Sequence, residues 1–412
     1  MTTDGFVLRQ FEIASPFAPQ TSSLDRPGKA LRLLVRYRGH PVGWVNVPTE
    51  GSATIDDSRI RHLITEQIGW DLAGFTFPAP DAPLEAPAVA APISVVVCTR
   101  DRPQDLERCL QALLALDYPD FEVLVVNNAS RNDESATVAA RLGVRSVRED
   151  RPGLDWARNR GIAETRHSII AFVDDDARPD SLWLAAIACA FVDPEVDAMT
   201  GLVAPLQLET FAQQLFELTY GGMGKGFAPR TFHRDRNTDA ELIGIQAVGV
   251  GTNMAFRREV FERVGLFDTA LDVGTPARGG GDLDMFHRVV ASGRTLLYQP
   301  AALVWHRHRR GMDELERQLG DDGCAFTVYL INLWRKRTVP RRAVLSFALR
   351  RWVPWLLKRF IRGVFGRGVL PLPLLWAPVR GLIAAPQAAW NAAHRDHQLR
   401  RHEPTMEARS NG

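Results

Sequence analysis

The sequence predicts an α/β fold with a doubly wound, mostly parallel sheet that is covered by helices on both faces. From Ile93 onward, short apolar and β-branched runs alternate with segments whose apolar residues recur at helical spacing. Polar residues follow directly after three of these runs, at the strand ends where such folds bind ligands. The chain has 412 residues, 45% hydrophobic and 24% charged, which is ordinary for a globular protein of more than one domain.

Residues 1–76 are expected to form a small accessory α+β domain. Residues 31–37 and 42–47 have strand composition and are separated by a short turn, which predicts a hairpin. A helix should follow, because apolar residues recur at helical spacing at Ile60, Leu63, Ile64 and Ile68. Alternating Pro and Ala make residues 77–92 a stiff linker. The first domain carries no catalytic constellation, so a docking role is expected.

Residues 93–335 are expected to form the main domain, in which strands and helices alternate. Strands are predicted at 93–99, 121–126, 145–147 and 170–173, and helices near 103–114, 137–142 and 157–164. This order predicts a parallel sheet. Thr99, Asn127 and Asp174 would then meet in one crevice at the carboxyl ends of their strands.

An acidic run, Asp174-Asp175-Asp176, follows the apolar strand at 170–173. Adjacent carboxylates repel one another, so a fold tolerates them best when a cation lies among them. Carboxylate oxygens suit Mg²⁺ or Mn²⁺. The run therefore predicts a site where such an ion bridges the protein and a phosphate-bearing substrate. The alternative is an acidic loop that is only solvated.

The C-terminal part of the chain is strongly basic, although the net charge is only +2. Residues 323–395 contain thirteen Lys and Arg and no Asp or Glu. Residues 336–393 are expected to form a basic amphipathic helical region, because one apolar stripe combines Leu345, Leu349, Trp352, Val353, Leu356, Phe360 and Val364. Tryptophan and leucine among cationic residues suit an interfacial helix on an anionic membrane. The alternative is a basic subdomain packed on the main domain.

The same region is not expected to span a membrane, because prolines and Arg380 interrupt the apolar stretch at 369–390. The polar residues 394–412 are expected to be disordered. No secretory signal is recognisable at the N-terminus, and the four cysteines lack paired metal-ligand spacing. We therefore expect a cytoplasmic protein, peripheral at the inner face of the cell membrane, that does not bind nucleic acid.

Seven segments resemble family 2 glycosyltransferases of the Rossmann-like GT-A fold, in the order of that family. They are residues 97–103, 125–130, 157–162, 172–176, 251–258, 280–285 and 304–308. Each is weak alone, but seven in order are specific. The resemblance spans about residues 92–310 and implies a metal-dependent, inverting glycosyltransferase of the hexosyltransferase type. Its substrates would be a nucleotide diphosphate sugar and a lipid-linked or cell-envelope glycan.

The resemblance gives the acidic run a DxD-type role. Asp174 and Asp176 would contact the metal and the nucleotide, and Asp175 the nucleotide sugar. The metal would stabilise charge that develops on the leaving diphosphate. A histidine near the end of the matched region can complete such a metal site, and His306 matches that position better than His308.

The donor nucleotide would be held at the other strand ends. Thr99 and Arg100 resemble nucleotide-holding positions, and Asn127-Asn128 replaces an acidic residue that reads the base in many members. An Asn side chain can still accept a hydrogen bond from uracil N3–H, so a UDP-type or dTDP-type donor remains compatible with these residues. The remaining matched donor-site or acceptor-site positions are Arg158, Asn159 and Asn253.

The catalytic base of the family corresponds to Asp282, with Asp284 as the alternative. The base deprotonates the acceptor hydroxyl for in-line attack at the anomeric carbon. The Glu that usually precedes this Asp is Gly281 here. We expect the glycines at 279–281 to let the backbone approach the sugar closely. Asp282 also suits a helix N-cap, a role compatible with the base.

Two other functions are compatible with the sequence. The Asn127-Asn128 and Gly281 departures fit a catalytically degenerate GT-A scaffold or binding protein at a membrane. A sugar nucleotidyltransferase would need a glycine-rich loop after the first strand to hold a triphosphate. Residues 99–103 contain no glycine.

Overall fold

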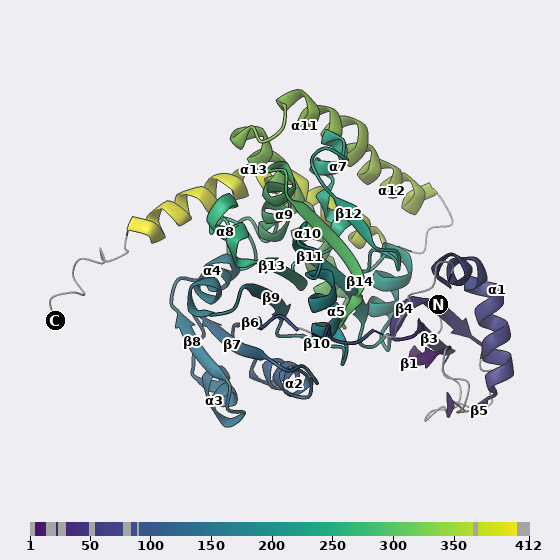
Figure 1. The fold of residues 1–412 in the computed structure, drawn as a ribbon. Helices are drawn as coiled ribbons and strands as arrows, with labels where there is room; N and C mark the ends of the chain where they lie inside the picture. The colour runs from purple at the N-terminus through teal and green to yellow at the C-terminus, as the bar shows by residue number, and fades with distance from the viewer. Residues whose placement is uncertain are drawn as a thin grey trace.

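The computed structural model describes residues 5–13, 22–23, 30–48, 54–76, 84–88, 90–365 and 370–401. Much of the predicted linker and the end of the predicted tail, residues 77–83, 89 and 402–412, lie outside this range. Figure 1 shows a central sheet with helices on both faces, a small N-terminal unit at one side, and a group of C-terminal helices across the other.

The central sheet confirms the predicted α/β fold. Its strands are β6 (Ile93–Thr99), β7 (Phe121–Asn128), β8 (Arg145–Glu149), β9 (Ile169–Asp174), β10 (Ala177–Pro179), β11 (Val196–Pro205), β12 (Arg230–Phe232), β13 (Asn253–Arg257) and β14 (Thr295–His306). They are ordered β10-β14-β11-β13-β9-β6-β7-β8, and β12 pairs with β14. The half from β8 to β9 is parallel as predicted. Beyond it, β13 runs antiparallel to β9 and β11, while β11 and β14 are parallel.

Helices cover both faces of this sheet because its strands are apolar on both sides. Val95 and Val97 of β6 pack into one buried cluster and Val96 into the other, as expected for alternating side chains. The first cluster includes α2 (Pro103–Leu114), α3 (Glu134–Arg141) and α5 (Trp183–Ala190). The second includes α4 (Leu154–Glu164), α7 (Asp239–Ile243), α8 (Arg258–Val264), α9 (Gly281–Ala291) and α10 (Met312–Lys336).

The N-terminal unit is a three-stranded sheet with one helix. It comprises β1 (Phe6–Glu12), β3 (Ala30–Tyr37), β4 (His40–Val47) and α1 (Asp57–Thr76), with a separate short pair of β2 (Ser22–Ser23) and β5 (Thr54–Ile55). The predicted hairpin is confirmed by the antiparallel pairing of β3 with β4. Leu33 of β3 faces α1, whereas its neighbour Leu34 packs against the main domain.

A buried ion pair fixes this unit to the main domain. Arg36 of β3 donates to Asp180 over 2.5 Å, and both side chains are almost fully buried. The ring of Trp44 meets that of Trp305 edge to face at 6.4 Å. These contacts hold the N-terminal sheet beside β14.

The C-terminal region is helical. It comprises α11 (Arg341–Phe347), a π-helical turn η3 (Ala348–Trp352), α12 (Val353–Phe365) and α13 (Leu372–Arg401). Among the residues that the structure describes, no helix is long and apolar enough to cross a membrane. The prolines at 378 and 386 lie inside α13 without ending it.

The expectation of disorder from residue 394 is wrong as far as residue 401, because α13 continues to Arg401. Its polar side chains clamp two loops of the main domain. The guanidinium of Arg395 donates to the carbonyl oxygens of Gly274 at 2.7 Å and Pro152 at 2.9 Å. Polar residues of the segment that was expected to be disordered therefore make tertiary hydrogen bonds.

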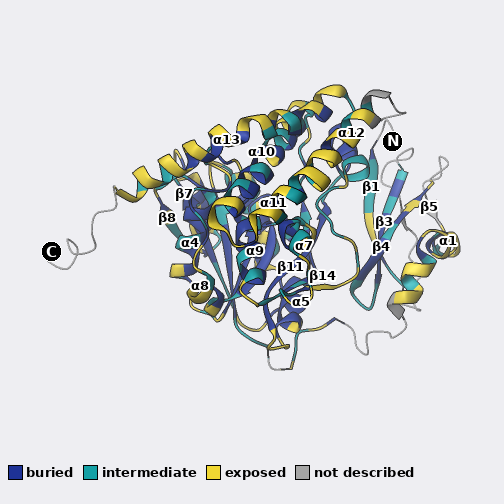
Figure 2. Cartoon of the chain, turned by 90° about the horizontal axis from the view of Figure 1, so that it is seen from above, coloured by how far each residue is buried: buried dark blue, intermediate teal, exposed yellow. Residues whose placement is uncertain are grey.

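Helices α10 and α13 cross at glycines that allow close backbone approach (Figure 2). A Cβ atom on Gly323 would lie 2.5 Å from the carbonyl oxygen of Pro378. A Cβ atom on Gly381 would overlap the carbonyl oxygen of Gly320 and lie 2.6 Å from the amide nitrogen of Cys324. The obstacles are backbone atoms, so an added side chain must push the helices apart.

We expect Gly381→Ala to lower the free energy of unfolding by about 2 kcal/mol, because overpacking a tight contact forces backbone shifts. Gly74→Ala is the matched control, since Gly74 of α1 has no atom near its missing Cβ. That variant should be as stable as the wild type or slightly more stable. Urea unfolding followed by circular dichroism measures both. Equal midpoints for Gly381→Ala and Gly74→Ala would contradict the close crossing.

Candidate active site

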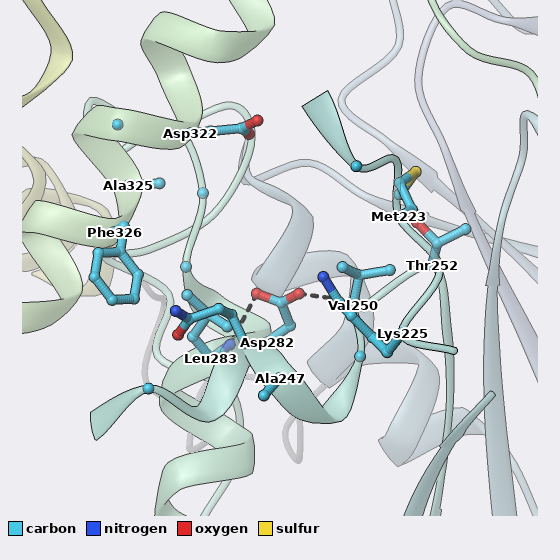
Figure 3. Close-up of a pocket in the computed structure, with 18 of the residues that line it drawn as sticks. Met223, Lys225, Ala247, Val250, Thr252, Asp282, Leu283, Asp322, Ala325 and Phe326 are labelled. Atoms are coloured by element: carbon cyan, nitrogen blue, oxygen red, sulfur yellow. Dashed lines mark hydrogen bonds between the residues drawn. The ribbon is translucent and has the colours of Figure 1, made fainter. Parts of the chain in front are cut away.

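A cavity of about 1070 Å³ opens beside the carboxyl ends of the parallel strands. Its lining includes Asp174 after β9, Asp282 of α9 and Asp322 of α10. Figure 3 shows Asp282 at its centre, with Lys225 and Asp322 on other sides. The C-terminal helices close one wall with Trp352 and Trp355. The cavity thus joins acidic groups of the main domain to aromatic groups of the C-terminal region.

The strand ends that the sequence predicted to meet do lie side by side. In the sheet register Thr99 lies opposite Asn127, and Cys98 lies opposite Asp174. The Thr99 hydroxyl donates to the Asp175 carboxylate over 2.8 Å. Parallel pairing of β6 with both β7 and β9 therefore brings residues far apart in the sequence together.

The three carboxylates of the acidic run point in different directions. Asp174 lines the cavity and accepts a hydrogen bond from the Thr252 hydroxyl over 2.6 Å. Asp175 and Asp176 are buried and share the guanidinium of Arg102 at 3.2 and 3.3 Å. The run is therefore not a solvated loop.

Burial and neighbouring charges separate the pKa values of these carboxyls. Burial raises the pKa of Asp175 to about 7, although Arg102 opposes that shift. Burial and the nearby Asp176 also raise the pKa of Asp174. Burial alone would raise the pKa of Asp176 too, but His306 and Arg102 hold it below its usual range. Asp176 is therefore the member that stays ionised most readily.

A chain of hydrogen bonds orients His306 toward Asp176. The Nε2 atom of His306 lies 3.3 Å from the Asp176 carboxylate, and its Nδ1 atom lies 3.1 Å from Nδ1 of His308. Nε2 of His308 lies 3.1 Å from the Glu217 carboxylate, which can only accept. If Glu217 fixes the proton of His308 on Nε2, Nδ1 of His308 accepts from Nδ1–H of His306. In that tautomer Nε2 of His306 makes no hydrogen bond to Asp176, and its lone pair is free for a cation placed between the two side chains.

The residues at this point fit a divalent cation that is completed by a substrate. Within the described ranges, no three or more His, Cys, Asp or Glu side chains are grouped so that they could hold a metal. Asp176 and His306 nevertheless bring a carboxylate and an imidazole nitrogen together, the donor types that Mn²⁺ accepts. Magnesium-type sites commonly use one or two carboxylates and take their other ligands from phosphates and water. The donor set therefore suits a metal–diphosphate site better than a closed structural site.

The two base candidates occupy different environments. Asp282 lines the cavity and accepts hydrogen bonds from the backbone N–H groups of Gly251 at 2.7 Å and Leu283 at 2.8 Å. Burial and Asp272 raise its pKa, although Arg158 opposes the shift. Asp284 lies outside the cavity lining and is paired with Lys336 at 2.8 Å and Arg288 at 2.7 Å. Of the two, only Asp282 lines the cavity.

A buried charge network lies under Asp282. Arg158 donates to Asp155 over 2.9 Å and to Asp272 over 2.5 Å, and all three side chains are nearly inaccessible. Burial and Asp272 raise the pKa of Asp155. One oxygen of Asp155 has no hydrogen-bond partner and occupies the space where Gly281 lacks a Cβ atom. Gly281 thus leaves room for the Asp155 carboxylate, and the expected close approach of a sugar to the backbone stays a prediction.

The asparagines predicted at the donor site divide into two groups. Asn127 is buried at the end of β7, and its side-chain oxygen has no partner. Asn128, by contrast, donates to the carbonyl oxygen of Arg151 and accepts from the amide of Gly153. The other predicted asparagines also bind their surroundings: Asn159 bonds the backbone of Phe267, and Asn253 bonds Trp183, Leu202 and Ala302. Of these four asparagines, Asn127 is the one whose buried side-chain oxygen accepts no hydrogen bond.

Arg100 lies exposed at the end of β6, next to the crevice. Its charge acts on Arg395 of α13, and burial together with Arg100 lowers the pKa of Arg395. The end of α13 therefore lies near the predicted donor-binding edge, which the sequence did not suggest.

Several charged residues of the site escaped the sequence analysis. Asp322 of α10 projects into the cavity, where burial and the nearby carboxylates of Asp321 and Asp282 raise its pKa to about 7. Lys225 faces the same space, and burial lowers its pKa while Asp282 opposes the shift. Neither belongs to a recognisable motif. The others are Asp155, Asp272 and Glu217. Of these three, only Asp155 could have been found from a local pattern. It lies three residues before Arg158 at the start of a helix, a spacing that predicts an ion pair.

Comparison with known proteins gives a consistent group of relatives. A sequence model of the family described as Glycosyl transferase family 2 matches residues 94–265. The chain is 25% identical over 269 residues to "Glycosyltransferase AglE" of Haloferax volcanii, covering 63% of this chain and 79% of the relative. It is 26% identical over 233 residues to the "Glucosyl-dolichyl phosphate glucuronosyltransferase" of the same organism, covering 52% and 69%. Asp282 and His306 lie beyond the residues that the family model matches.

Among solved structures, the chain is similar to the mannosyltransferase PcManGT from Pyrobaculum calidifontis in complex with GDP-Man and Mn²⁺. The TM-score is 0.45 and the sequence identity is 18%, with 79% of each chain covered.

The charge network under Asp282 can be tested by removing its cation. We expect Arg158→Met to lower the free energy of unfolding by about 3–5 kcal/mol, because it leaves the carboxylates of Asp155 and Asp272 buried without a partner. Arg166→Met is the control, since Arg166 pairs with Glu122 at the surface and its side chain is 77% exposed. That variant should lose less than about 1 kcal/mol. Urea unfolding of both variants checks the difference, and similar losses would contradict the importance of the buried network.

Proposed function

We propose that this chain, a family 2 glycosyltransferase, transfers a sugar from a nucleotide diphosphate sugar to an acceptor hydroxyl with inversion of the anomeric configuration. The observation that carries this proposal is the position of Asp282. Its carboxylate lies in the cavity beside Asp174, at the edge that gathers the ends of β6, β7 and β9. A base is thereby placed next to a crevice suited to a diphosphate.

The donor nucleotide is proposed to bind at Thr99, Arg100 and Asn127. The unpartnered buried oxygen of Asn127 supports a base that presents an N–H group, as uracil and thymine do at N3. A UDP-type or dTDP-type donor follows from this. Asn128, Arg158, Asn159 and Asn253 would act by holding the backbone and the charge network around the nucleotide rather than by touching it.

The acidic run is proposed to hold Mg²⁺ or Mn²⁺ through Asp176 and His306, with Asp174 facing the cavity side of the same site. When bound, the ion would neutralise the diphosphate and stabilise the charge that develops on it. Asp175 would position the run through Thr99 and Arg102. His308 and Glu217 would hold the ring of His306 in one tautomer.

Asp282 is proposed to accept the proton of the acceptor hydroxyl during attack on the anomeric carbon. A new bond from the acceptor oxygen to that carbon replaces the bond to the diphosphate oxygen, and the nucleoside diphosphate leaves. Because this is a single in-line displacement, the anomeric configuration inverts. The raised pKa of Asp282 makes it a stronger base than an exposed aspartate, although part of its population is then protonated at lower pH.

The acceptor is proposed to be a lipid-linked or cell-envelope glycan, handled at the inner face of the cell membrane. Aromatic side chains from the C-terminal helices line the cavity together with Lys225, which suits an acceptor that has polar and apolar parts. The name of one relative includes a dolichyl phosphate carrier. A degenerate scaffold would instead show no transfer, and the experiments below separate that outcome.

The base assignment predicts different effects at two neighbouring carboxyls. We expect Asp282→Asn to reduce the rate of sugar transfer by about 10²–10⁴-fold while nucleotide binding measured by calorimetry is retained, because a general base is lost. Wild-type activity should rise with pH through a pKa above the usual aspartate range. Asp284→Asn is the matched control and should keep its rate where it remains folded. Transfer by Asp282→Asn at the wild-type rate would overturn the assignment.

The metal site predicts a graded loss of affinity. We expect EDTA to abolish transfer and added Mn²⁺ to restore it. In titrations followed by electron paramagnetic resonance with UDP present, His306→Ala should weaken Mn²⁺ binding strongly. Glu217→Ala should weaken it by about 10–100-fold, because the hydrogen bond that orients the histidine pair is lost. His62→Ala, at an exposed histidine of α1, is the control. Unchanged Mn²⁺ affinity in His306→Ala would exclude His306 as a ligand.

A further inference from the structure

A stripe of exposed apolar side chains runs along α11, η3 and α12. Figure 2 shows exposed positions along α11 and α12. Its members are spaced four residues apart, so they lie on one side of the helical arm that these elements form. They are Leu345, Leu349, Val353, Leu357 and Ile361, each between 41% and 60% exposed. Single exposed leucines are common on soluble proteins, but a continuous row marks an interaction surface. We call this stripe the outer face of the arm.

Cationic side chains flank the outer face, and Glu241 of α7 lies close enough to Arg351 for their charges to interact. Those on the arm whose side chains are exposed are Arg341, Arg342, Arg350, Arg351 and Lys358. The sequence has no Asp or Glu from residue 323 to residue 395. A surface that combines apolar side chains with this one-sided charge fits the interface of an anionic lipid bilayer.

The inner face of the same arm closes the cavity. Phe347, Trp352 and Trp355 line it, and the ring of Trp352 packs against Phe326 of α10 at 4.6 Å. The arm therefore separates the cavity from the outer face by the thickness of one helix. A surface seated on the outer face would lie directly beside the cavity that contains Asp282.

We propose that the outer face of the arm docks on an anionic membrane, so that an acceptor with an apolar chain reaches the cavity without leaving the bilayer. The docking itself follows from the surface, and only the delivery of the acceptor rests on the proposed function. Docking would place the headgroup region next to Trp352 and Trp355. Trp376 of α13 is also exposed, and its ring lies 6.0 Å from that of Phe360 of α12.

The test is co-sedimentation of the full chain with vesicles of phosphatidylcholine alone or mixed with phosphatidylglycerol. Wild-type protein should bind the mixed vesicles and release them at high salt. Leu349→Ser combined with Leu357→Ser should lose most of this binding. Arg342→Glu combined with Arg350→Glu should lower the partition coefficient by at least about fivefold for each charge removed.

The matched control variants make the same kinds of substitution at exposed residues outside the arm. Trp70→Ser with Val192→Ser changes side chains that are 92% and 66% exposed, and Arg263→Glu reverses an exposed charge on α8. These variants should bind vesicles as the wild type does. Thermal unfolding confirms that every variant is folded.

Three outcomes would overturn the docking proposal. They are no binding of the wild type to anionic vesicles, equal binding of the Leu349/Leu357 variant, and conversion of a dimer to a monomer by that variant without any vesicle binding. The last would show that a second copy covers the outer face. Transfer to a water-soluble acceptor should persist in the arm variants. Loss of vesicle binding with intact transfer, or the reverse, therefore separates failure of the docking from failure of the proposed function.

Discussion

The site depends on one constraint, which is that carboxylates crowded at one edge of a sheet need fixed cations. Arg158 neutralises Asp155 and Asp272 beneath Asp282, and Arg102 lies between Asp175 and Asp176. Without such partners these groups would repel one another and take up protons. The partners come from α4 and from the loop after β6, so the fold of the parallel half of the sheet determines which carboxylates remain ionised.

The same constraint explains why distant parts of the chain close around this edge. Asp272 lies in a loop that α13 clamps, since Arg395 bonds Gly274 and Pro152 on either side of the network. Gly323 and Gly381 bring α13 close enough to α10 for that clamp to form. The C-terminal region is thus part of the structural support of the site as well as one wall of its cavity.

The sequence was informative where local patterns sufficed. Alternating apolar strands placed Thr99, Asn127 and Asp174 at one edge, because parallel strands end together. The sequence did not predict contacts between residues that are far apart in the chain. Asp272 meets Arg158 across 114 residues of sequence, and no pattern links them. The polar end of α13 suggested disorder because no local pattern shows that its hydrogen-bond partners lie in remote loops.

The π-helical turn η1 (Leu215–Tyr220) connects the histidine pair His306 and His308 to the C-terminal arm. At its centre Glu217 holds His308, and at its end Tyr220 lies under the guanidinium of Arg359 of α12 at 3.7 Å. Such turns insert an extra residue and recur at functional sites, because they redirect side chains within a helix. A displacement of α12 must therefore either break the stacking on Tyr220 or move the turn that carries Glu217. The position of the arm and the orientation of the histidine pair are consequently parts of one packed unit.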